Sequence, residues 1–203
     1  MKKLVTMILC ISLMVSLVAC GSGGTDTAGP TKEVSENKTT LTVSIPTDPG
    51  TFYPYYMLSG VGRALYTPVY ESLFIYGEDT TPEACLVDSY EIDDDGMGIT
   101  LNLLHGVLFH DGTEMKANDV IFSINCLRDS NWATNIGDIN MDASYAVDDY
   151  TVYLKYNSVQ GPLLYMLCNV YVISESYMSS INEDDWTYNC IGTGSYKWGE
   201  YSA

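Results

Sequence analysis

Basic residues are scarce in this chain, which has nine lysines and arginines against 26 aspartates and glutamates in 203 residues. The formal net charge of −17 repels phosphate backbones, so the composition excludes nucleic acid as a partner. Histidine is also scarce, and the two histidines, His105 and His110, fall in one turn-rich block. Nucleophilic catalysis needs a base oriented beside a nucleophile, and no such arrangement is visible. We therefore predict no enzyme activity and no cofactor.

Cysteine motifs for metal or redox chemistry are missing as well. Beyond the N-terminal segment four cysteines remain, at wide and irregular spacings: Cys85, Cys126, Cys168 and Cys190. Without a C-x-x-C pair the spacings indicate neither zinc nor a redox centre, although four thiols allow three pairings. We favour free, buried thiols. His105, His110 and Asp111 carry ligating atoms, but their place in a turn predicts a structural role, and we predict no metal site there.

The N-terminus has an apolar run, residues 4–17, that is shorter than the roughly 18 residues needed to span a bilayer. Lys2 and Lys3 precede it, and Leu-Val-Ala follows directly before Cys20. This pattern is typical of an export signal with a lipobox, so we predict a signal peptide at residues 1–19 and a lipid on Cys20. Residues 20–38, rich in Gly, Ser and Thr, predict a flexible tether. The expected location is extracytoplasmic, on the outer face of the cell membrane or facing the periplasm.

The rest of the chain predicts a mixed α and β fold in which strands dominate. Alternating apolar residues predict strands at residues 41–45, 73–76, 89–93, 98–103, 151–156 and 169–173. Helical spacing predicts helices at residues 58–69, limited by Pro68, at 118–128, capped by Asn118, and at 161–168. Asp148 and Asp149 predict a hairpin turn between residues 145–147 and 151–156. The Asp111-Gly112 pair predicts a turn in which the glycine has a positive φ.

Two separated blocks carry a family resemblance. Residues 109–123, FHDGTEMKANDVIFS, resemble the "FxDGxxxxAxDVxFS" block of the family 5 extracellular solute-binding proteins, and residues 191–196, IGTGSY, are similar to that family's "GTGPY". Further matches reach from residue 41 to the C-terminal residues. The chain is identified as a member of this family, which contains the oligopeptide-, dipeptide- and nickel-binding components of ABC importers.

The resemblance implies a fold like that of the type II periplasmic binding proteins, of class α+β or α/β. We expect residues 39–75 to begin lobe I, residues 76–185 to form an inserted, mostly-β subdomain, and residues 186–203 to return to lobe I through a strand near Gly194. Family members continue past the "GTGPY" motif into a second lobe. The expectation for this chain is therefore an incomplete first lobe and a missing second lobe.

The resemblance also implies a function and a set of ligand contacts. The expected function is capture of a solute, most directly a peptide, for the permease of an ABC importer. In peptide-binding members the segment after the "LDP" loop lines the cleft, and here Phe52-Tyr53-Pro54 stands at that loop. The matching contacts are Met57, Leu58, Ser59 and Gly60. Aromatic rings often line such pockets, which adds Tyr55 and Trp132, with core packing as the alternative for each.

Two other classes of function remain open at this point. A lipid-anchored protein of this kind also suits peptide or pheromone sensing, and the same family includes binders of nickel or oligosaccharides. The second other class is a lipid-anchored enzyme. Uptake of labelled peptides separates transport from sensing, and a hydrolase screen addresses the enzyme.

The lipobox generates the first prediction, which concerns Cys20. Replacing Cys20 with Ser removes the thiol that receives the lipid, so the protein should leave the membrane fraction for the soluble fraction. Fractionation of cells with an antibody against the protein measures this. An N-terminus upstream of residue 20, found by mass spectrometry in wild-type cells, would contradict the prediction.

Overall fold

The computed structural model describes residues 40–56 and 60–200, and the contacts below fall in the unit that starts at Leu41. Its helices are α2 (Gly60–Tyr66), α3 (Ala117–Arg128), α4 (Leu163–Leu167) and α5 (Glu175–Ser180), with 3-10 turns η1 (Ala133–Ile136) and η2 (Glu183–Asp185). Its strands are β1 (Phe74–Tyr76), β2 (Pro82–Ala84), β3 (Val87–Ile92), β4 (Gly98–Leu103), β5 (Ile139–Ala146) and β6 (Thr151–Tyr156). None of the helices in these ranges has the length and apolar character needed to cross a membrane. The predicted signal peptide, Cys20 and the tether lie outside the described residues.

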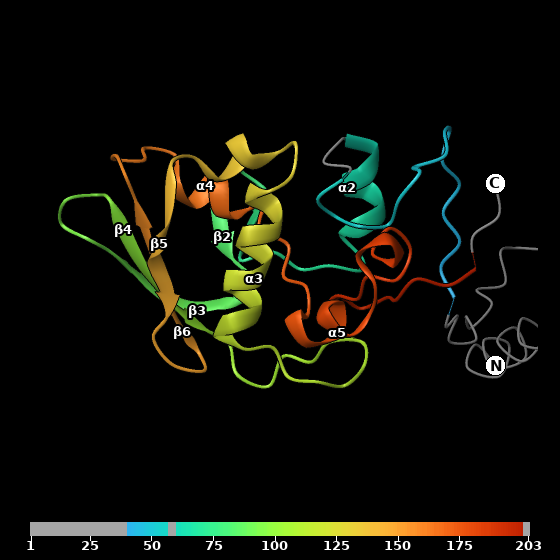
Figure 1. Cartoon of the computed structure of the whole chain (residues 1–203). Helices are drawn as coiled ribbons and strands as arrows, with labels where there is room; N and C mark the ends of the chain where they lie inside the picture. The colour runs from blue at the N-terminus through green and yellow to red at the C-terminus, as the bar shows by residue number, and fades with distance from the viewer. Residues whose placement is uncertain (1–39, 57–59, 201–203) are drawn as a thin grey trace, which may run out of the picture. The chain divides into compact units, whose positions relative to one another are not determined.

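An antiparallel sheet with the order β3-β4-β6-β5 carries much of the core (Figure 1). Ile99 and Leu101 of β4 lie opposite Leu154 and Val152 of β6. Directly opposite residues share one face of a sheet, and these four side chains are fully buried. Helix α3 packs against β5 and β6, so it covers this apolar face. A separate ladder pairs β1 with β2.

Helix α3 is held at its start by a buried carboxylate. Val120, Ile124 and Leu127 are fully buried along one side of the helix, as predicted. Burial of each side chain stabilises the fold by about 1.5–3 kcal/mol relative to leaving it exposed. The predicted cap at Asn118 is wrong, because the helix begins one residue earlier and Lys116 is its N-cap. Asp119 accepts a hydrogen bond from the Lys116 backbone N–H at 2.8 Å, which satisfies a donor at the helix start.

The same carboxylate ties a second helix to α3. The other oxygen of Asp119 accepts from the backbone N–H of Glu175, at the start of α5, also at 2.8 Å. Burial is the main influence on Asp119 and raises the pKa of its carboxyl, while these two hydrogen bonds act in the opposite direction. Asp119 therefore joins α3 to α5, although Asp119 and Glu175 lie 56 residues apart in the sequence.

Several predicted elements are confirmed. Strand β4 has the predicted limits, and β5 and β6 form the predicted hairpin, although β5 extends further toward the N-terminus. Helix α2 ends at Tyr66, just before Pro68, whose ring cannot continue a helix. Helix α4 lies within the predicted range, and β3 is one of the predicted strands shifted by one or two residues. Helix α5 and strand β2 were not predicted.

The strand expected at residues 41–45 is wrong. No strand of the described part includes these residues, and Leu41 and Val43 are 51% and 47% exposed. A strand is stabilised by hydrogen bonds to a neighbouring strand, and no described segment pairs with this one. Alternation of apolar residues alone does not supply that neighbour.

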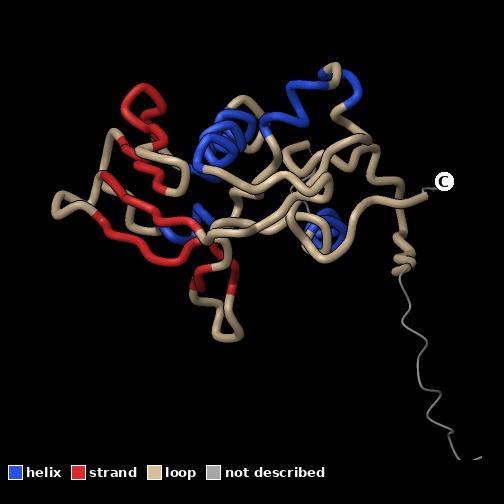
Figure 2. The backbone as a smooth tube through the Cα atoms, turned by 90° about the horizontal axis from the view of Figure 1, so that it is seen from below, coloured by secondary structure: helices blue, strands red, loops and turns tan. Residues whose placement is uncertain are grey.

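Two further predicted strands are replaced by isolated backbone pairing. Within residues 169–173 a single bridge joins Tyr171 to Ser72, with the Val172 N–H donating to the Glu71 carbonyl at 3.0 Å. No return strand forms near Gly194. That segment instead runs as loop toward the C-terminal end, as Figure 2 shows, and it contacts the Pro68–Tyr70 backbone. A short pairing of this kind satisfies a few backbone groups without building a ladder.

The turn after Phe109 generates a stability prediction. Gly112 has the predicted positive φ, 87°, and a side chain there would meet nothing within 4 Å. Gly112→Val should therefore lower the free energy of unfolding through backbone strain alone, by about 1–2 kcal/mol. Urea unfolding measures the difference. Gly199→Val is the matched control, because Gly199 also has open space but no positive φ. Equal unfolding free energies for the two variants would contradict this account.

Candidate functional site

The aromatic loop at residues 51–56 is built into the core. The Phe52 N–H donates to the carbonyl of Thr187 at 2.6 Å, and the Tyr53 N–H donates to the hydroxyl of Thr51 at 3.0 Å. Thr51 through Tyr55 are buried, whereas Tyr56 is 53% exposed. The loop therefore presents Tyr56 at its surface end, directly before the segment expected to line the ligand cleft.

Three segments meet at a cluster of rings that we call the aromatic junction, made by Phe52, Tyr70, Tyr188 and Trp198. Phe52 stacks on Trp198 with ring centroids 4.3 Å apart, and the edge of Tyr188 approaches Phe52 at 5.8 Å. The Tyr70 hydroxyl accepts from the Trp198 indole N–H at 2.8 Å and donates to the Phe52 carbonyl at 2.9 Å. Burial raises the pKa of Tyr70, so the phenol stays protonated as a donor.

The two motif blocks of the sequence lie against each other through His110. The backbone N–H of His110 donates to the Gly192 carbonyl at 3.1 Å, and the backbone N–H of Gly192 donates to Nδ1 of the His110 ring at 3.4 Å. Because Nδ1 accepts, the ring proton lies on Nε2, which donates to the Gly194 carbonyl at 2.8 Å. This arrangement gives His110 the structural role that the sequence predicts.

Gly192 and Gly194 pass the Pro68–Tyr70 backbone too closely for any side chain. A Cβ on Gly192 would lie 2.3 Å from the Val69 carbonyl oxygen, and one on Gly194 would lie 2.5 Å from the Pro68 oxygen. At this distance the Gly194 and Tyr196 N–H groups donate to the Val69 and Pro68 carbonyls, both at 2.9 Å. The "GTG" glycines therefore serve a backbone contact.

A hollow of about 220 Å³ opens beside the aromatic junction. Its lining combines rings with polar and charged groups: His110, Asp111, Tyr177, Tyr188, Asn189, Cys190, Ile191, Lys197 and Trp198. Lys197 has no carboxylate partner among the described residues. A ring surface with one ammonium and one carboxylate suits a small solute that carries both charge and apolar surface.

The histidine and the cysteine that line the hollow are held in structural roles among the described residues. Both ring nitrogens of His110 are engaged by the backbone of residues 192–194, so His110 does not act on a neighbouring nucleophile. Burial raises the pKa of the Cys190 thiol to about 12, which keeps it protonated and unreactive at neutral pH. Cys85, Cys126, Cys168 and Cys190 are all free thiols. The described residues contain no group of three or more acidic, His or Cys side chains placed to hold a metal ion.

Of the predicted ligand contacts, the structure places Tyr55, Gly60 and Trp132. Tyr55 is fully buried, and its hydroxyl donates to the Tyr171 carbonyl, so it packs in the core. Trp132 is half-buried beyond the end of α3, where its backbone N–H donates to the Ser130 hydroxyl. Gly60 is the first residue of α2. Met57, Leu58 and Ser59 lie outside the described residues.

Sequence reasoning missed the residues around the aromatic junction. Tyr188, Lys197 and Trp198 are not among the predicted site residues, and their convergence at the aromatic junction depends on contacts between distant segments. One signal was available. Lys197 and Trp198 directly follow residues 191–196, IGTGSY, so the same close backbone approach that needs the glycines also positions these two side chains.

Solved structures place the fold among the periplasmic binding proteins. The ABC transporter-associated periplasmic binding protein DppA from Helicobacter pylori, solved in complex with the peptide STSA, matches with a TM-score of 0.65 and 23% identity over 76% of this chain. The ABC transporter substrate-binding protein CtaP from Listeria monocytogenes matches with a TM-score of 0.67 and 28% identity over 78% of this chain. The chain covers 35% and 33% of those two proteins. The predicted fold is confirmed.

The family follows from the sequence matches. Residues 81–203 match "Bacterial extracellular solute-binding proteins, family 5 Middle", and the chain belongs to this family. The oligopeptide-binding protein OppA of Bacillus subtilis is 30% identical over 155 residues, which is 75% of this chain and 26% of OppA. The predicted family resemblance is thereby confirmed, and the chain spans about a quarter of the length of that relative.

The close approach of the glycines generates a prediction about Gly192. Gly192→Ala places a methyl group against the Val69 carbonyl, which is itself held by the Gly194 N–H, so relief requires the segment to move. We expect the free energy of unfolding to fall by about 1–3 kcal/mol, and the near-ultraviolet circular dichroism of the Phe52–Trp198 stack to change. Gly161→Ala is the control, because nothing lies within 4 Å there. A Gly192→Ala protein with both signals unchanged would rule out the close approach.

Proposed function

We propose that this chain is part of an extracytoplasmic solute-binding lipoprotein that captures peptides and delivers them to the permease of an ABC importer. The observation that carries the proposal is the 30% identity with OppA, named as an oligopeptide-binding protein, over 155 residues. The structural match to DppA with bound peptide supports the same ligand class.

The proposed mode of binding uses the peptide backbone. We propose that Met57, Leu58, Ser59 and Gly60 line the cleft and pair their N–H and C=O groups with an extended peptide, as a neighbouring strand would. Such pairing gives affinity that depends little on the peptide's side chains, which suits a transporter for many peptides. Tyr56, exposed beside this segment, borders the proposed cleft. Trp132 and the buried Tyr55 keep supporting roles in this proposal.

The proposal includes anchoring and organisation of the chain. A lipid on Cys20 would hold the protein at the membrane through several acyl chains, and residues 20–38 would let the folded part reach solute and permease. Residues 39–75 and 186–203 would belong to lobe I, with residues 76–185 as the inserted subdomain. The sheet of β3 to β6 lies within that insertion.

Peptide uptake in the source cells tests the proposed function. Deleting the gene should abolish uptake of a labelled pentapeptide while uptake of a labelled free amino acid continues, because the importer loses its binding component. Reintroduced wild-type gene should restore peptide uptake. Unchanged peptide uptake in the deletion strain, with growth and amino-acid uptake normal, would contradict the proposal.

A variant pair sharpens the test of backbone pairing. Ser59→Pro removes a backbone N–H at the proposed cleft, whereas Ser59→Ala keeps it, and a proline just before a helix is tolerated. The Pro variant should therefore restore peptide uptake poorly at an equal protein level, and the Ala variant should restore it fully. Full restoration by both variants would remove Ser59 from the proposed cleft.

A further inference from the structure

The edge strand β3 extends the core face of the sheet beyond what the helices cover. Tyr90 and Ile92 lie opposite Leu101 and Ile99 of β4, so all four side chains are on the same face. Leu101 and Ile99 are fully buried, but Tyr90 and Ile92 are 43% and 42% exposed. Within the described part of the chain, the apolar face that is buried in β4 therefore continues uncovered at the edge of the sheet.

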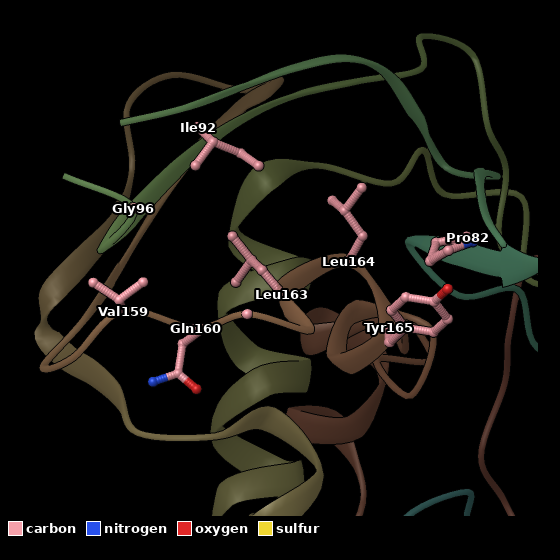
Figure 3. Close-up of a pocket in the computed structure, with 9 residues that line it drawn as sticks. Pro82, Ile92, Gly96, Val159, Gln160, Leu163, Leu164 and Tyr165 are labelled. Carbon is pink, nitrogen blue, oxygen red and sulfur yellow. The ribbon is translucent and has the colours of Figure 1, made fainter. Parts of the chain in front are cut away.

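A hollow of about 240 Å³ lies at this uncovered end (Figure 3). Ile92 borders it from β3, Leu163, Leu164 and Tyr165 from α4, and Val159 from the loop before α4. Tyr165 and Val159 are themselves 42% and 67% exposed, so the hollow opens within a larger apolar surface. Exposed apolar patches with a concave centre mark sites where another molecule binds.

An acidic turn borders the hollow on one side. Asp93, Asp94 and Asp95 form the turn between two lining residues, Ile92 and Gly96. Lys155 lies 3.6 Å from Asp93 and 3.2 Å from Asp95, so this cation is shared by two carboxylates, and Asp94 is exposed with no ion pair among the described residues. Residues 76–185 contain 20 acidic and three basic residues in all.

We propose that this hollow is the docking site for a positively charged segment of a partner protein, which inserts one aliphatic or aromatic side chain between β3 and α4. The apolar lining accepts the side chain, and the acidic turn attracts the flanking cations and speeds their approach. A second copy of this chain is disfavoured as the occupant, because each copy carries a net charge of −17. The site is separate from the proposed peptide cleft and does not depend on it.

Fluorescence anisotropy of the full chain with a synthetic peptide tests the docking site. The probe is a short labelled peptide with several lysines around a single leucine. It should bind saturably, and Val159→Asp should weaken it about tenfold even though the added carboxylate attracts lysine. Val147→Asp is the matched control, since Val147 is 54% exposed, lies in another loop and receives the same charge. This control should bind like wild type.

Three outcomes would overturn the proposal. Equal binding of a peptide with serine in place of leucine would mean that the peptide is held only by general attraction to an acidic surface. Equal binding of a peptide with glutamates in place of the lysines would mean that the peptide is held only by unselective apolar contact. A dimer in sedimentation experiments that Val159→Asp dissociates would assign the hollow to a second copy. Equal unfolding curves for the Val159 and Val147 variants confirm that folding is not the cause of any difference.

Discussion

The close approach of two backbone segments, possible because Gly192 and Gly194 lack side chains, is the constraint on which this part of the structure depends. The approach brings the segment after residue 186 against Pro68–Tyr70, and hydrogen bonds from His110 to Gly192 and Gly194 also hold it. Trp198 can then stack on Phe52 and donate to Tyr70. Chain segments that are far apart in sequence become one packed unit.

The sheet of β3 to β6 and the aromatic loop at residues 51–56 belong to the same packed unit. Tyr53 and Tyr55 of the loop lie in one hydrophobic core with residues of β3 to β6 and α3, and the Phe52 N–H donates to the Thr187 carbonyl. A binding surface needs a rigid support, and rings held by hydrogen bonds at their polar tips supply rigidity. The surface residue Tyr56 and the hollow near Lys197 are then positioned by buried neighbours.

Elements with strong local signals were predictable from the sequence. The limits of β4, the hairpin of β5 and β6, the end of α2 before Pro68 and the φ of Gly112 all follow from patterns within a few residues. Features that depend on distant partners were not. The start of α5, which was not predicted, depends on the Glu175 N–H donating to Asp119, and the candidate site depends on Trp198 meeting Phe52. A strand at residues 41–45 was predicted from alternation, but a strand also needs a paired neighbour.

Native-state hydrogen exchange of the backbone amides tests the central constraint most directly. The N–H groups of Gly194 and Tyr196 donate to the Val69 and Pro68 carbonyls, so opening them requires the two segments to separate. They should exchange nearly as slowly as the amide of Leu101 in the buried strand β4, because both report large-scale opening. Exchange of Gly194 and Tyr196 as fast as that of the exposed Gly199 amide would contradict the account.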